Sequence, residues 1–246
     1  YVADLVIYGV KSYHNNKAIP VIKNSIIDNT TILTLQNGIG SGEFLASHFG
    51  KDKVVLGAAY IDASISGYGV IQEYGGNCKI VFGKKNGRDN YHTEKIKNIL
   101  TPTKIKQELS EEILTTIWEK LIFISGLSGM TCITNSTFDE IISYNQTKNT
   151  TKLLITETYD VAIASGIKLE KNIVETTMEY FINLKSKMTS SMHQDLINGN
   201  PLEIDVINGF ISKIGKIYNV PTPINDTISS CLSLTSNLRI SNKEIK

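Results

Sequence analysis

The chain has 246 residues, 41% of them hydrophobic, and its 25 basic and 24 acidic residues leave a formal net charge of +1. A chain of this size can bury a full core in one or two domains. The balanced charge gives no indication of a nucleic-acid or membrane-surface partner, and no run of about 18 apolar residues predicts a membrane span. Three widely spaced cysteines without a CxxC motif argue against a disulfide framework or a metal site. We therefore expect a cytoplasmic protein without a bound metal.

The first hundred or so residues predict strands that alternate with helices. We expect strands at 4–10, 30–36 and 54–59, and helices at 15–27, kinked at Pro20, and at 42–49. Such alternation is typical of right-handed βαβ units with a parallel sheet. A hairpin with strands at 70–74 and 79–83, turning at Gly75-Gly76, and a helix at 90–100 are expected to complete this layer.

From Ser110 onward the sequence predicts helices only. Ser110 is the expected N-cap of a helix that runs to about Gly126, with two glutamates in its first turn. Further helices are expected at 137–144, 148–165, 170–188, 200–219 and 223–236. The predicted fold is therefore α/β followed by all-α, with a partial Rossmann-type parallel sheet over residues 1–106 and a C-terminal helical domain over residues 107–246.

An α/β layer of this kind normally opens with a GxGxxG motif after its first strand. The sequence has none, and the glycine-rich segment 38–42 lacks the required spacing. We therefore expect the sequence to be a fragment that lacks a first βαβ half of roughly 60–70 residues.

Lys120 is the most unusual candidate, because apolar residues cover nearly all sides of its predicted helix. Its ammonium must reach either a polar cavity or the surface. In a semi-buried cleft, desolvation would lower its pKa toward neutrality, which suits a proton donor. Alternatively, its stem lies along apolar surface with the ammonium in water. The sequence alone favours neither interpretation.

Other candidates each have an ordinary structural explanation. Glu203 could close a capping box with Asn200, and helix-capping preferences alone favour that purely structural role. Ser190 and Ser191, expected between two helices, could cap a helix or hold a carboxylate. No GxSxG motif is present and His193 lacks an evident serine and acid partner, so a hydrolase triad is not expected.

Lys11 and Asn37 each follow a predicted parallel strand. In open α/β sheets, ligands bind outside the carboxyl ends of the strands, so both residues are expected at a crevice. The alternative is ordinary loop chemistry, since Asn-Gly is a common turn pair.

Four segments, in this order, resemble the ketopantoate reductases (2-dehydropantoate 2-reductases). They are DLVIYGVKSY, LTLQNGIGSGEFL, IWEKLIFISGLSGMT and SSMHQDLINGNPLEIDVINGF, and the resemblance extends over essentially the whole chain. It implies NADPH-dependent reduction of ketopantoate to pantoate in pantothenate and coenzyme A biosynthesis. A homodimer is one expected assembly. Without its phosphate-binding loop, the chain is expected to bind NADPH poorly and to be inactive alone.

The resemblance also assigns roles to individual residues, of which Lys120, Glu203, Ser191 and Asn37 are expected to converge on one interdomain cleft. Lys120 matches the catalytic proton donor, Ser191 and Ser128 match substrate-binding positions, and Asn37 matches an asparagine near the nicotinamide and the substrate. Lys11, Ala63 and Glu203 match cofactor-binding positions.

Two positions after Lys120 depart from the family pattern. The family usually places two substrate-binding asparagines where this chain has Ile124 and Ser128. A site built for hydrogen bonds discriminates strongly, so the loss of an amide predicts a kept reaction class with a changed substrate. Two alternatives follow: a reductase of another 2-oxo acid, and a non-catalytic relative that serves as a binding or dimerisation module.

Overall fold

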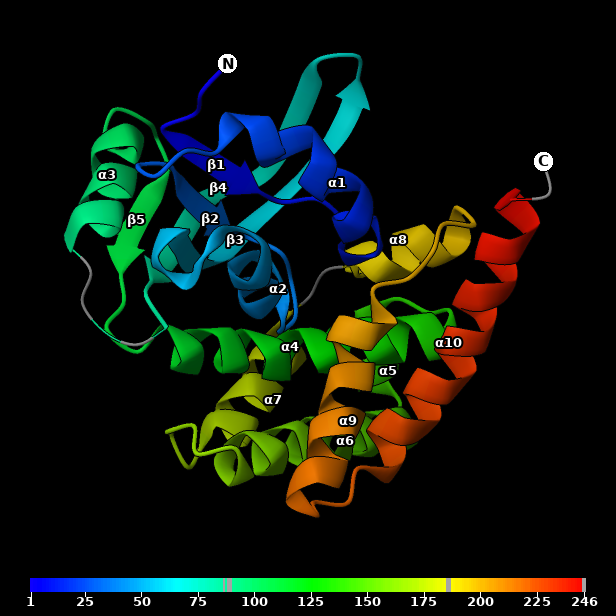
Figure 1. Ribbon diagram of the computed structural model, residues 1–246. Helices are drawn as coiled ribbons and strands as arrows, with labels where there is room; N and C mark the ends of the chain where they lie inside the picture. The colour runs from blue at the N-terminus through cyan, green and yellow to red at the C-terminus, as the bar shows by residue number, and fades with distance from the viewer. Residues whose placement is uncertain (86, 88–89, 185–186, 245–246) are drawn as a thin grey trace. The chain divides into compact units, whose positions relative to one another are not determined.

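The structure is a computed structural model that describes residues 1–85, 87, 90–184 and 187–244 (Figure 1). The chain forms two compact units, Tyr1–Ile117 and Trp118–Lys246. The first unit is built on a sheet and the second is helical, so the α/β and all-α parts of the fold prediction are confirmed.

The first unit contains a five-stranded sheet in the order β1-β2-β3-β4-β5. The strands are β1 (Leu5–Tyr8), β2 (Thr31–Thr34), β3 (Val54–Gly67), β4 (Val70–Gly83) and β5 (Lys106–Leu109). The first three are parallel, β4 is antiparallel to β3, and β5 is parallel to β4. The sheet is therefore mixed, with the parallel part at its beginning, and β5 is a strand that the sequence pattern did not reveal.

Helices cover both faces of this sheet. α1 (Asn15–Ile22) and α2 (Ser41–Phe49) pack on the face that carries Ile32 and Val54, and α3 (Asn90–Leu100) packs on the face that carries Leu33 and Val55. Successive side chains of a strand point to opposite faces, so strands buried on both sides are apolar throughout. Short 3₁₀ turns flank the helices at Ser12–His14, Lys23–Ser25 and Lys51–Lys53, so the helix predicted at 15–27 is shorter than expected.

The predicted turn at Gly75-Gly76 is wrong. β3 and β4 form one long ribbon that turns at Tyr68 and Gly69, where Gly69 has a φ of 69° (Figure 1). Gly75 instead lies in an irregularity of β4, where the pairing shifts between Tyr60 and Asp62. Glycine serves a turn and a bulge equally well, so composition could not separate the two.

The second unit consists of helices. α4 (Ile113–Thr134) begins in the first unit and continues into the second. It is followed by α5 (Phe138–Ser143), α6 (Asn145–Ala164), α7 (Ile173–Asn183), α8 (Ser191–Ile197), the 3₁₀ turn η4 (Ile204–Val206), α9 (Asn208–Tyr218) and α10 (Pro223–Glu244). The six helices predicted after residue 110 are thereby confirmed with shifted ends, and α8 was not predicted.

Two helix starts differ from the prediction. α4 begins at Ile113, and Ser110 forms a local turn in which its Oγ accepts from the Glu112 amide at 3.2 Å. The helix predicted from residue 200 begins only at Asn208, after η4. In both cases a residue with good capping chemistry is used for a turn outside the helix, a competition that such side chains commonly enter.

α4 is the central helix of the second unit. A Cβ at Gly126 would lie 2.8 Å from Ile155 of α6, so glycine allows the close approach of these two helices. A Cβ at Gly129 would lie 3.1 Å from Asn208 of α9 and 3.2 Å from Ile228 of α10, so these side chains would have to shift by a few tenths of an ångström. Trp118 contacts Phe210 of α9 with ring centroids 5.9 Å apart. α4 is long and apolar enough to cross a membrane by those two criteria alone. A core helix has the same apolar composition, and α4 packs against α6, α9 and α10 as a core helix does.

Candidate active-site residues in the two units

Lys120 lies near the start of the central helix and is half-buried. Burial lowers the pKa of its ammonium to about 8, because the charged form loses hydration. A lysine with its ammonium in bulk water would keep its ordinary pKa, so the surface interpretation is disfavoured. The structure thus gives Lys120 the property that a proton donor near neutral pH needs.

Ile124 and Ser128 follow Lys120 at intervals of one helical turn, so the three side chains share one face of α4. Both residues are buried, with exposed fractions of 9% and 5%. The face that carries the candidate proton donor is therefore apolar at the next turn and offers a single hydroxyl at the turn after it.

Glu203 does not form the capping box that helix-capping preferences predicted. Asn200 is no N-cap, since no helix starts directly after it, and its Nδ2 donates to Asp195 Oδ1 at 3.3 Å. Glu203 instead ends an irregular segment fixed to α10 by the Leu202 amide, which donates to Ser236 Oγ at 2.9 Å. The carboxyl side chain is buried, with an exposed fraction of 6%. Burying a carboxylate is costly, and helix capping does not explain it here.

Ser190 and Ser191 have different roles. Ser190 is the N-cap of α8, where its Oγ accepts from the His193 amide at 3.0 Å, and it is buried. Ser191 is the first residue of α8 and is exposed. Capping therefore accounts for Ser190, while Ser191 has a side chain that a ligand could reach.

In the first unit, Lys11 and Asn37 follow β1 and β2, which are adjacent and parallel. Their side chains consequently start from the same edge of the sheet. After Asn37 the chain passes through Gly38 and Gly40, with φ of 81° and 113°, a left-handed backbone that glycine adopts without strain. This edge is the one at which open α/β sheets bind ligands.

Gln36 is a residue of this edge that the sequence analysis missed. Its Nε2 donates to the Val10 carbonyl at 2.6 Å and to Asn15 Oδ1 at 2.8 Å, which ties the loop of Asn37 to that of Lys11. Its Oε1 is buried and has no hydrogen-bond partner among the described residues. A glutamine directly after a strand and before Asn-Gly was the signal that could have revealed it.

Ala63, the last predicted cofactor residue, lies on the β3–β4 ribbon opposite Glu73 and is exposed. The ribbon extends beyond its neighbours in the sheet, since β2 pairs with Val54–Leu56 of the ribbon and β5 pairs with Lys79–Phe82.

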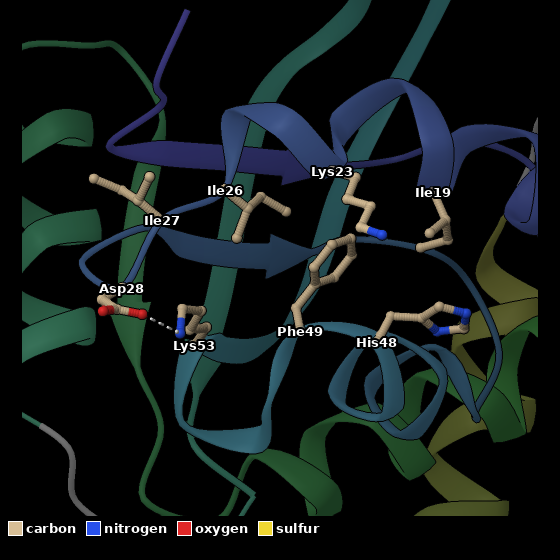
Figure 2. A pocket seen from close by; sticks show the side chains of 8 residues that line it. All are labelled: Ile19, Lys23, Ile26, Ile27, Asp28, His48, Phe49 and Lys53. Atoms are coloured by element: carbon tan, nitrogen blue, oxygen red, sulfur yellow. Dashed lines mark ion pairs between the residues drawn. The ribbon is translucent and has the colours of Figure 1, made fainter.

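A hollow of about 350 Å³ lies elsewhere in the first unit (Figure 2). It begins at the amino ends of β2 and β3, near Asp28 and Lys53, and extends between α1 and α2 past Phe49. Lys53 Nζ and Asp28 Oδ1 are 3.6 Å apart at one end of it. None of the predicted site residues lines this hollow, so we give it no part in the candidate chemistry.

Two family models match the chain. Residues 112–235 match the model described as "Ketopantoate reductase PanE/ApbA C terminal", and residues 2–87 match "Ketopantoate reductase PanE/ApbA". Together these matches include every candidate residue named above.

Individual relatives are similar to this chain over most of its length. An uncharacterized oxidoreductase of Bacillus subtilis, YkpB, is 25% identical over 231 residues, which cover 94% of this chain and 76% of the relative. A 2-dehydropantoate 2-reductase of Halobacterium salinarum is 24% identical over 232 residues, with the same two coverages. The crystal structure of a 2-dehydropantoate 2-reductase from Geobacter metallireducens superposes with a TM-score of 0.88 at 23% identity, covering 95% of this chain and 77% of that one. This last likeness concerns the fold.

Proposed function

The chain belongs to the ketopantoate reductase family and is an oxidoreductase, and from this we propose that it catalyses the NADPH-dependent reduction of a 2-oxo acid, with ketopantoate as the first candidate. The product would be pantoate, a precursor in pantothenate and coenzyme A biosynthesis. The observation that carries the proposal is the pKa of Lys120, which burial lowers to about 8 on the central helix.

Lys120 is the proposed proton donor. Reduction of a ketone creates an alkoxide on the former carbonyl oxygen, and an ammonium held beside that oxygen can protonate it. A donor with a pKa near 8 is mostly protonated at neutral pH yet gives up its proton more readily than an ordinary lysine. Ser191 and Ser128 are proposed to bind the substrate, and Asn37 and Glu203 to border both substrate and cofactor.

A nicotinamide nucleotide fits the residues at the carboxyl edge of β1 and β2. When bound, it supplies the hydride. Lys11 offers a cation to a phosphate, and the left-handed Gly38 and Gly40 allow close approach of the backbone. Gln36 Oε1, which has no hydrogen-bond partner in the part of the chain that the structure describes, can accept from a hydroxyl or an amide. We place Ala63 and Glu203 at the same cofactor.

The substrate is the second part of the proposal. Ile124 offers no hydrogen bond on the face of Lys120, so a second candidate is a more apolar branched 2-oxo acid. The three cysteines are free thiols, which supports a reducing, cytoplasmic setting. A homodimer is the assembly that we propose for the enzyme.

The experiment that tests the function follows NADPH oxidation by the full-length protein with ketopantoate, 2-oxoisovalerate and a panel of other 2-oxo acids. We expect oxidation that depends on the oxo acid, and faster oxidation of NADPH than of NADH. A full-length protein that binds NADPH but reduces no member of the panel would contradict the proposal and favour a binding or dimerisation module.

A further inference from the structure

Two side-chain contacts join the last turns of α4 to the first turn of α8. Thr131 Oγ1 and Ser190 Oγ are 3.1 Å apart, and Asn135 Oδ1 and His193 Nε2 are 3.0 Å apart. The residues involved are separated by 59 and 58 positions in the sequence. On each helix the two contacts lie about one turn apart, so together they fix both the position and the rotation of α8 relative to α4.

The first contact is part of a chain of hydrogen bonds. The His193 amide donates to Ser190 Oγ at 3.0 Å, and the Thr131 hydroxyl donates to the Leu127 carbonyl at 2.7 Å. Thr131 Oγ1 therefore has a lone pair for the Ser190 hydroxyl, whose own oxygen is occupied by the amide. The chain leads from the backbone of α8 to the backbone of α4 through buried groups, where a lost partner is costly.

The second contact has a defined proton arrangement. Because Asn135 Oδ1 is an acceptor, His193 Nε2 carries the hydrogen, and Nδ1 carries a lone pair that has no partner among the described residues. Burial lowers the pKa of His193, which keeps the ring neutral. Asn135 has a φ of 51° just past the end of α4, a conformation in which glycine is the usual residue. An asparagine there keeps the turn and adds the oxygen that His193 contacts.

α8 depends on such contacts. It has only seven residues, and a helix of that length is not stable by itself in water. Ser191, its first residue, is exposed and lies between the N-cap Ser190 and His193, which make the two contacts.

We propose that Asn135 and His193 are positioning residues that, with the Thr131–Ser190 contact, hold Ser191 in a fixed place relative to the helix that carries Lys120. The inference rests on the proposed function, since it takes Ser191 as the residue that binds the oxo acid. Neither residue touches the substrate in this arrangement. Their effect is on the binding of the oxo acid and not on the cofactor.

The test uses the full-length enzyme and four variants. His193→Leu removes the donor and fills the same space, His193→Gln restores an NH₂ group near the place of Nε2, and Asn135→Gly removes the acceptor while suiting the left-handed backbone. Asn219→Gly is the matched control, because Asn219 has a φ of 56° at the end of α9 and is exposed.

We expect His193→Leu and Asn135→Gly to raise the KM for the oxo acid about 2–13-fold, the range for one lost hydrogen bond, with kcat and the KM for NADPH nearly unchanged. His193→Gln should recover most of the loss and Asn219→Gly should show none. Since the effect passes through Ser191, His193→Leu should add nothing in a Ser191→Ala background. Hydrogen exchange of the α8 amides should accelerate in His193→Leu, with α9 unchanged.

Several outcomes would overturn the inference. An unchanged KM for the oxo acid in an active His193→Leu enzyme would do so while leaving the proposed function intact. Additive effects with Ser191→Ala, or unchanged exchange of α8, would show that the contacts position nothing. A wild-type enzyme that reduces no 2-oxo acid would remove the proposed function and this inference together.

Discussion

At the residue scale, desolvation lowers the pKa of Lys120. From the sequence two interpretations are equally favoured, because a lysine in an apolar helix can place its ammonium in a polar cleft or extend it to water. In the structure its pKa is lowered to about 8, and burial is the cause. A solvated ammonium would not be shifted in this way, so the side chain is held in a place where its charged form is disfavoured.

Replacement of Lys120 tests its role in the chemistry. In the full-length enzyme, Lys120→Ala should lower kcat roughly 10²–10⁴-fold, the usual effect of a lost general acid, with a smaller change in NADPH affinity. Lys213→Ala is the control, since Lys213 is an exposed lysine of α9. Near-native turnover of Lys120→Ala in a steady-state assay would remove Lys120 from the mechanism.

The pH dependence of the rate offers an independent check of the same residue. A proton donor must be protonated before the reaction, so kcat/KM, which reports the groups of the enzyme before the oxo acid binds, should be constant below the pKa of Lys120 and fall above about pH 8. A pH profile of kcat/KM for ketopantoate at saturating NADPH measures this. A rate that stays constant up to pH 10 would contradict the assignment.

Ile124 decides the substrate prediction. A ketopantoate hydroxyl lacks an amide partner on this face of α4, and one hydrogen bond to an uncharged group is worth about 2–13-fold in affinity. Ile124→Asn should therefore lower the KM for ketopantoate by a factor in that range, and should not lower the KM for 2-oxoisovalerate, which has no such hydroxyl. A KM for ketopantoate that is already low and does not respond would show that other residues bind the hydroxyl.

At the element scale, short helices and helix starts depend on partners that are distant in sequence. α10 begins where Glu157 of α6 accepts from the Ile224 and Asn225 amides at 2.9 and 3.0 Å. Asn208 of α9 joins the same buried group, with its Nδ2 2.9 Å from Asn225 Oδ1. The first turn of α10 is thus satisfied by another helix and not by its own N-cap.

Glu157 provides the prediction at this scale. Glu157→Ala leaves the amides of Ile224 and Asn225 and the Asn225 side chain without their buried acceptor, so the free energy of unfolding should fall by roughly 2–4 kcal/mol. Urea denaturation measures the change. Glu179→Ala is the control, because Glu179 is exposed on α7, and it should have little effect. Equal stability of the two variants would contradict the role of Glu157 as a cap.

At the scale of the whole molecule, a desolvated lysine makes stability depend on pH. The folded pKa of Lys120 is about 8 and its ordinary value is 10.5. Between these values the folded state has released the proton that the unfolded state still binds, so the free energy of unfolding rises with pH in this window. A gain of about 3 kcal/mol from pH 8 to pH 10.5 is expected from the size of the shift.

Lys120→Met isolates this contribution. It keeps a long apolar side chain without a titrating group, so its stability should lack the rise from Lys120 and exceed that of the wild type most strongly below pH 8. Chemical denaturation of both proteins from pH 7 to pH 10.5 measures the difference. A difference that does not change with pH would contradict a lowered pKa for Lys120. Lys213→Met should follow the wild type throughout.

The sequence by itself determined the two-part architecture, because periodicity and composition are local properties. Strands at 30–36 and 54–59 and the long apolar helix after residue 110 were identified from apolar patterns that burial requires. The lysine, asparagine and serine candidates were identified by resemblance and by position after strands. Their convergence on one site stays a prediction.

Only the tertiary structure decided which conformation a segment adopts where its local sequence allows more than one. Gly75-Gly76 could turn or bulge, and the pairing of β3 with β4 places it in the bulge. Asn200 and Glu203 form a good capping box in sequence, yet packing against α10 holds this segment out of a helix and buries Glu203. α8 is too short to be specified by its own propensity and is held through Thr131 and Asn135. In each case a contact distant in sequence outweighs a local preference of about 1 kcal/mol, and such contacts leave no periodic trace in the chain.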